Sequence, residues 1–112
     1  MATADDFRRI ALSFPEAEEG AHMGHPDFRV GGRVFASLGK PDAAHGMVAL
    51  LPEQQGDFMT LGPDVFRPAA GTWGAGGSTL VRLEAVTEDL LETALAAAWA
   101  RRAGKKTASP SA

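Results

Sequence analysis

The chain has 112 residues, of which 45% are hydrophobic and 22% are charged. These values fit one domain with a single core and exclude a chain that is disordered along its whole length. The absence of cysteine excludes disulfides and thiol chemistry. No stretch approaches the roughly 18 consecutive apolar residues of a membrane-spanning helix, and the acidic N-terminus lacks an apolar signal segment. We therefore expect a cytoplasmic protein without membrane contact.

Charge is distributed unevenly along the chain. The formal net charge is −3, but four of the eleven basic residues lie in the last dozen positions, namely Arg101, Arg102, Lys105 and Lys106. Residues 1–100 hold seven basic and fourteen acidic residues, a net charge of −7. An acidic body repels a phosphate backbone unless its few basic side chains gather on one face. Strong nonspecific binding of nucleic acid by the body is therefore disfavoured.

The N-terminal segment predicts a helix followed by a short strand. Thr3 can cap the helix and Pro15 ends it. Its apolar residues recur at helical spacing: Phe7, Ile10, Ala11 and Phe14. A polar strand is expected at 18–23, before Gly24 and Pro26 interrupt the chain.

A β-hairpin is predicted around Gly31-Gly32. Strand-like runs at 27–30 and 33–38 flank these two glycines, which supply the positive φ that a two-residue hairpin turn needs. Such a turn pairs residues across the hairpin as Val30 with Arg33, Arg29 with Val34, and Phe28 with Phe35. Arg29 and Arg33 then lie on opposite faces, with Asp27, Val34 and Ala36 on the face of Arg29. A further strand is expected at 45–51.

The second half of the chain predicts two helices and a late strand. A short helix starts at Pro52 and stops at Gly62-Pro63, with Phe58, Met59 and Leu61 facing inward. An extended piece at 65–68, a loop at 69–77 and a strand at 78–84 follow. Thr87 caps the closing helix, whose apolar stripe is Leu91, Ala94, Leu95, Ala98 and Trp99.

Together these elements predict the α+β class, with an antiparallel sheet meander, an N-terminal helix, a short middle helix and a C-terminal helix packed on the sheet. Residues 1–104 are expected to form the single domain. Residues 105–112 are small, polar and proline-containing, which predicts a disordered tail.

Catalytic and cofactor motifs are missing from the sequence. The serines lie in no nucleophile motif, and the glycine-rich stretch at 71–77 lacks the lysine and the helix of a phosphate-binding loop. His22 and His25 would point to opposite faces of a strand, so we expect them and His45 to form hydrogen bonds and not a metal site. No cofactor is expected.

Five residues are candidates for contacts with nucleic acid or another ligand: His25, Arg29, Arg33, Trp73 and Arg82. In the structural interpretation, Arg33 lies at the solvent-exposed hairpin tip and Arg29 pairs with a carboxylate such as Glu18 or Glu19; in the functional interpretation, they form an anion or phosphate site. Trp73 is either a core anchor, the commoner fate of a tryptophan beside a strand, or an exposed stacking platform.

Residues 5–103 of the chain resemble one known protein family. The hairpin HPDFRVGGR from His25 to Arg33, the helix start LPEQQ, and the strand STLVRL after Trp73 resemble the MmcQ/YjbR family. The resemblance implies a small α/β domain with an outline similar to the bacterial frataxin-like fold, for which DNA binding has been proposed. Family members often carry basic residues where this chain has Ala75 to Ser78.

Three functions remain open from the sequence, one of them an enzyme or metal protein built around His22, His25 and His45. The resemblance implies DNA binding, supported by the hairpin arginines and the basic end of the last helix. The alternative is a non-enzymatic module that binds a protein or a small ligand in a groove near Gly31-Gly32 and Trp73.

Overall fold

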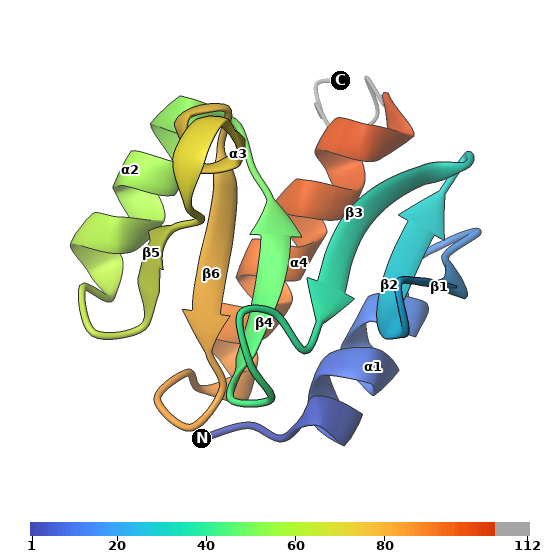
Figure 1. Cartoon of the computed structure of the whole chain (residues 1–112), viewed down its shortest axis with the longest axis horizontal. Coiled ribbons are helices and arrows are strands. Elements are labelled where there is room, and N and C mark those ends of the chain that lie inside the picture. Colours follow the sequence, from blue (N-terminus) through green and yellow to red (C-terminus); the bar gives the residue numbers. More distant parts are fainter. Residues whose placement is uncertain (105–112) are drawn as a thin grey trace.

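The computed structural model describes residues 1–104 and shows a six-stranded antiparallel sheet in the order β1-β2-β3-β4-β6-β5 (Figure 1). The strands are β1 (Glu18–His22), β2 (His25–Val30), β3 (Arg33–Leu38), β4 (His45–Ala49), β5 (Phe66–Pro68) and β6 (Ser78–Arg82). The helices are α1 (Ala4–Leu12), α2 (Pro52–Leu61), α3 (Gly71–Ala75) and α4 (Glu88–Ala103). None of these helices is long and apolar enough to cross a membrane. The expected α+β class is confirmed.

Helices α1 and α4 cover one face of the sheet. Helix α1 starts as predicted, because Thr3 and Asp6 each accept a hydrogen bond from the other's backbone N–H. Its Phe7 meets Phe28 of β2 with ring centroids 5.8 Å apart. Helix α4 lies behind β3 and β4 in Figure 1 and contributes the fully buried Leu91 and Leu95. The hydrophobic core therefore lies between these helices and one sheet face.

The middle helix α2 lies along the edge of the sheet. The Oε1 atom of Gln54 accepts the N–H of Leu51 at its start, and Phe58 packs on Phe66 of β5 with ring centroids 5.2 Å apart. The prediction that Leu61 faces inward is wrong, since it is 69% exposed. Because α2 lies at the sheet edge, only one narrow stripe of its surface packs against other residues.

The β2–β3 hairpin forms around Gly31-Gly32, whose φ angles are 58° and 79°. Val30 pairs with Arg33 and Arg29 with Val34, as expected. The expected pairing of Phe28 with Phe35 is wrong, because a β-bulge shifts the register and pairs Phe28 with Ala36. The extra residue allows both Phe35 and Ala36 to be buried, so Ala36 does not share the open face with Arg29.

Two further features complete the fold. The segment 69–77, predicted as a loop, contains the short helix α3. On α4, Trp99 packs at the rim of the core, where its Nε1 donates to the carbonyl of Pro15 at 3.0 Å and its ring stacks on Phe14. The expected disorder of residues 105–112 concerns a segment outside the described residues.

Candidate functional site

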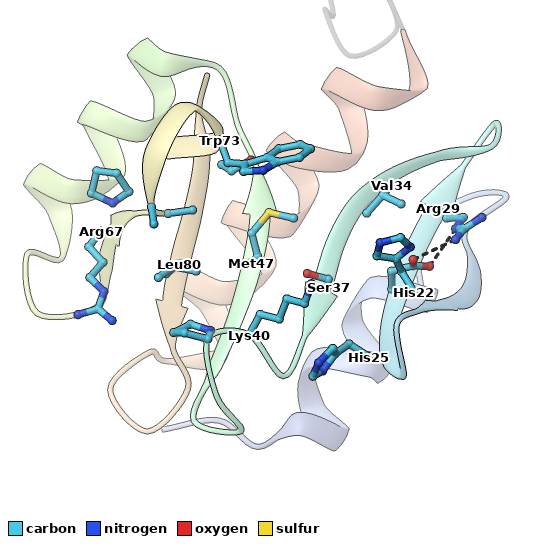
Figure 2. Close-up of a pocket in the computed structure, with 16 residues that line it drawn as sticks. His22, His25, Arg29, Val34, Ser37, Lys40, Met47, Arg67, Trp73 and Leu80 are labelled. Atoms are coloured by element: carbon cyan, nitrogen blue, oxygen red, sulfur yellow. Dashed lines mark hydrogen bonds and ion pairs between the residues drawn. The ribbon is translucent and has the colours of Figure 1, made fainter. Parts of the chain in front are cut away.

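A trough of about 780 Å³ runs across the sheet face opposite α1 and α4 (Figure 2). Because side chains alternate along a strand, residues between those of the core point to this open face. Val34 and Ser37 of β3, Met47 of β4, and Ser78 and Leu80 of β6 form its floor. The rest of the lining comes from the strands at either side, from two loops and from α3: His22, His25, Asp27, Arg29, Lys40, Pro41, Arg67, Pro68, Ala69, Ala70 and Trp73.

Trp73 projects from α3 over the trough. This position decides between the two interpretations of Trp73, as a core anchor or as an exposed platform, that the sequence left open. The residue is 74% exposed, so the core-anchor interpretation is wrong. Figure 2 shows its indole extending from α3 across β4 in the direction of Val34. Gln55 of α2 fixes α3, because its Nε2 lies 3.1 Å from the carbonyl oxygens of both Gly74 and Ser78. The indole is therefore presented by a tethered helix.

Asp27 and Arg29 form a two-point ion pair at the other side of the trough. Arg29 Nε and Nη2 donate to the two carboxylate oxygens at 2.9 and 3.0 Å. Asp27 is 2% exposed and raises the pKa of Arg29 above its ordinary value. Arg29 therefore pairs with a carboxylate, as expected, but its partner is Asp27, two residues away on its own strand, and not Glu18 or Glu19.

Gly20 makes room for this ion pair. It lies opposite Asp27 in the β1–β2 ladder. A Cβ at Gly20 would stand 3.0 Å from Asp27 Oδ1 and 3.2 Å from Arg29 Nε, which is tighter than ordinary contact. The glycine thus lets the pair lie flat on the neighbouring strand.

The three histidines are placed differently from the expectation. His22 and His25 pair across a two-residue turn at Met23-Gly24 and both line the trough, so the prediction that they point to opposite faces is wrong. In Figure 2 their rings nevertheless diverge. His45 lies apart from them, with its Nδ1 2.8 Å from Asp42 Oδ1. Within residues 1–104, no three acidic or histidine side chains are grouped as metal ligands would be.

Lys40 and Arg67 line the trough but were not recognised from the sequence. Arg67 follows the buried Phe66 in β5, so strand alternation could have assigned it to the open face. Lys40 lies in the β3–β4 loop, where no periodic signal exists. Neither forms a salt bridge within the described chain. The hydrogen bond to His45 is the chief cause that lowers the pKa of Asp42, and the positive charge of Arg67 lowers it further.

Arg33 and Arg82 lie outside the trough. Arg33 is exposed at the tip of the β2–β3 hairpin, as the structural interpretation of this residue predicted. Arg82 is engaged by Glu84, with 2.8 Å between Nη2 and Oε2. Of the five candidates, the structure therefore brings together three: His25, Arg29 and Trp73.

The basic end of α4 is occupied by contacts within the fold. Arg101 Nη1 donates to the carbonyl of Leu50 at 2.7 Å, and Arg102 Nε donates to that of Val34 at 3.1 Å. Burial lowers the pKa of Arg102, with smaller contributions from Arg101 and Arg33. Lys105 and Lys106 lie outside the described residues. Arg101 and Arg102 thus tie α4 to the sheet.

Comparison with known proteins bears out the resemblance carried by the hairpin. A family model described as YjbR matches residues 12–101. This chain belongs to the YjbR family. The fold is similar to the crystal structure of the Deinococcus radiodurans protein DR2400, which carries a DUF419 domain, with a TM-score of 0.75 and 20% sequence identity. That match covers 96% of this chain and 85% of the other. No curated protein matches this YjbR chain.

Proposed function

We propose that this YjbR domain is a non-enzymatic binding module and that the trough holds a small organic ligand. Its volume of about 780 Å³ lies within the range of roughly 300–1,000 Å³ typical of small-molecule sites. Val34, Met47 and Leu80 give the floor its apolar surface, and polar groups lie beside and around them, as in such sites. On the cysteine-free sequence we place the module in the cytoplasm.

The observation that carries this proposal is the exposure of Trp73 above an apolar floor. Burying a large apolar side chain stabilises a fold by about 1.5–3 kcal/mol, yet 74% of Trp73 is left in water. The tether through Gln55 keeps α3 in place, so the indole and Met47 line the same hollow from two sides. A flat ligand between them would take both surfaces out of water.

The second candidate function is DNA binding on the same face, which the family resemblance implies. The observation that favours it is the presence of Arg29, Lys40 and Arg67 together in the trough. Three cations, one of them paired with Asp27, can neutralise few phosphates. We therefore expect a dissociation constant for random duplex of about 1 μM or weaker at physiological salt. Fluorescence anisotropy with a labelled duplex at two salt concentrations measures this, and submicromolar binding would favour the DNA function over the small-ligand function.

The small-ligand function can be tested by NMR with a library of soluble aromatic fragments. Ligands in the trough should shift the indole N–H signal of Trp73 and the backbone amides of Met47 and Ser78. The indole signal of Trp99 is the internal reference, because that N–H is held by Pro15 on the helix-covered side. Hits that shift Trp99 and leave Trp73 unchanged, or a library without hits, would refute the proposal.

A matched pair of variants tests the role of the indole. Trp73→Ala should abolish fragment binding, whereas Leu61→Ala should leave it unchanged. The two side chains are similarly exposed, at 74% and 69%, but Leu61 does not line the trough. Equal losses in both variants would mean that the fragments bind exposed apolar surface in general.

A further inference from the structure

Hydrogen-bond donors dominate the polar part of the trough. Arg29, Lys40 and Arg67 can only donate, and the hydroxyls of Ser37 and Ser78 can donate as well. Among the described residues, Asp27 is the only carboxylate in the lining, and both of its oxygens already accept from Arg29. A ligand rich in acceptors therefore fits this surface better than one rich in donors.

The ion pair with Asp27 fixes the orientation of Arg29 before such a ligand binds. Nε and Nη2 are bound to Asp27, which fixes the plane of the guanidinium group. Nη1 makes no hydrogen bond within residues 1–104, and 40% of the side chain is exposed. Because Arg29 balances the negative charge of Asp27, this carboxylate repels an incoming anion only weakly.

Arg67 adds positive charge on the side of the floor opposite Arg29, and Lys40 adds it between the two. Figure 2 places Arg67 on the β5 side and Arg29 on the β2 side, with Lys40, Met47 and Leu80 between them. The carboxylate of Asp42 interacts with the charge of Arg67, but it is bound to His45 and is not part of the lining. The face thus combines an excess of positive charge with an apolar centre, although the body of the chain is acidic.

Building on the proposed function, we propose that the trough binds an organic oxyanion that carries a flat ring. The ring lies between the indole of Trp73 and the floor at Met47 and Leu80. The oxyanion, a phosphate or a carboxylate, lies in the positive field of Arg29, Lys40 and Arg67 and accepts hydrogen bonds from the nearer of them, since Arg29 and Arg67 lie on opposite sides of the floor. The two halves of the ligand therefore match the two chemical parts of the lining.

Three probes of the same shape separate the ring from the charge: 1-naphthyl phosphate, 1-naphthoate and the neutral 1-naphthamide. Each is titrated into the full chain while the Trp73 indole N–H signal is followed. Both anions should bind roughly tenfold tighter than the amide at low salt, because charge-assisted hydrogen bonds are stronger than neutral ones. The difference should shrink at high salt, which screens exposed charges.

Charge-removing variants locate the anion. Arg67→Gln and Lys40→Gln should each weaken binding of the two anions roughly two- to fivefold and leave that of 1-naphthamide unchanged. Neither side chain forms a hydrogen bond or salt bridge within the described chain, so the fold should be unaffected. Arg33→Gln removes the same charge at the hairpin tip and should change no affinity.

The outcomes distinguish this inference from the proposed function. If none of the three probes shifts Trp73 although fragments of the library do, only the oxyanion inference is wrong; if neither the probes nor the fragments shift it, both are wrong. If 1-naphthamide binds as tightly as the anions, the trough binds ligands but the oxyanion inference is wrong. If Arg33→Gln weakens the anions as much as Arg67→Gln, the charge effect is not local to the trough and the inference is also wrong. A preference for phosphate or for carboxylate supports it and identifies the group.

Discussion

Breaking the Asp27–Arg29 ion pair should destabilise the fold measurably. Arg29→Met keeps the length and apolar stem of the side chain but leaves Asp27 without its partner. A buried charge stripped of its partner typically costs 3–5 kcal/mol. Here Asp27 is 2% exposed, but 40% of the Arg29 side chain reaches water, which can partly solvate the remaining carboxylate. We therefore expect a loss of about 2–3 kcal/mol in the free energy of unfolding.

Urea unfolding of a double-mutant cycle checks this reasoning. Asp27→Leu/Arg29→Met replaces the pair with apolar side chains and should be more stable than Arg29→Met alone. Arg82→Met is the matched control, because it breaks a pair in which Arg82 and Glu84 are 47% and 66% exposed, and it should cost at most about 1 kcal/mol. The reasoning is refuted if Arg29→Met costs no more than Arg82→Met, or if the double variant is the less stable one.

Three further predictions concern the hairpin, the tether and acid stability. Gly32→Val should cost about 1–3 kcal/mol, because φ is 79° there, whereas Gly76→Val, at φ −85°, should cost less; equal urea midpoints would contradict this. Gln55→Met should cost about 0.5–1.5 kcal/mol, because it removes the hydrogen bonds that tether α3 while the carbonyls of Gly74 and Ser78 keep their backbone donors, and an unchanged melting temperature would contradict that. Hydrogen bonds from Thr3 lower the pKa of Asp6 below its ordinary 3.8. The contribution of the ionised Asp6 to the stability of the fold is therefore complete above that pH and is lost as the pH falls through the folded-state pKa. Asp6→Ala should flatten the fall in stability below pH 3.8, and an unchanged acid profile would show that the cap contributes nothing.

Local signals in the sequence were sufficient for most of the fold. The cap at Thr3, the Gly31-Gly32 turn and the cap at Thr87 are each specified by neighbouring residues. The bulge that pairs Phe28 with Ala36 was not predictable, because it depends on how two buried side chains share the core.

The candidate site was predicted only in part, for reasons that differ from residue to residue. His22 and His25 pair across a turn in which Gly24 has the usual positive φ but Met23 adopts a φ of 56°, which residues other than glycine seldom do, so only half of the turn has its usual signature. The partner of Arg29 depends on Gly20 lying opposite Asp27, a matter of register between strands. The exposure of Trp73 follows from where Gln55 holds α3, and nothing near Trp73 in the sequence encodes that contact.

The most direct test of the trough as the binding site uses methyl-labelled methionine and bound 1-naphthyl phosphate. Met47 lies on the floor of the trough, while Met23, which is 78% exposed at the β1–β2 turn, is outside the lining. Intermolecular nuclear Overhauser effects should connect the naphthyl protons with the methyl group of Met47 and not with that of Met23. Contacts to Met23 without contacts to Met47 would contradict the assignment of the open sheet face as the ligand site.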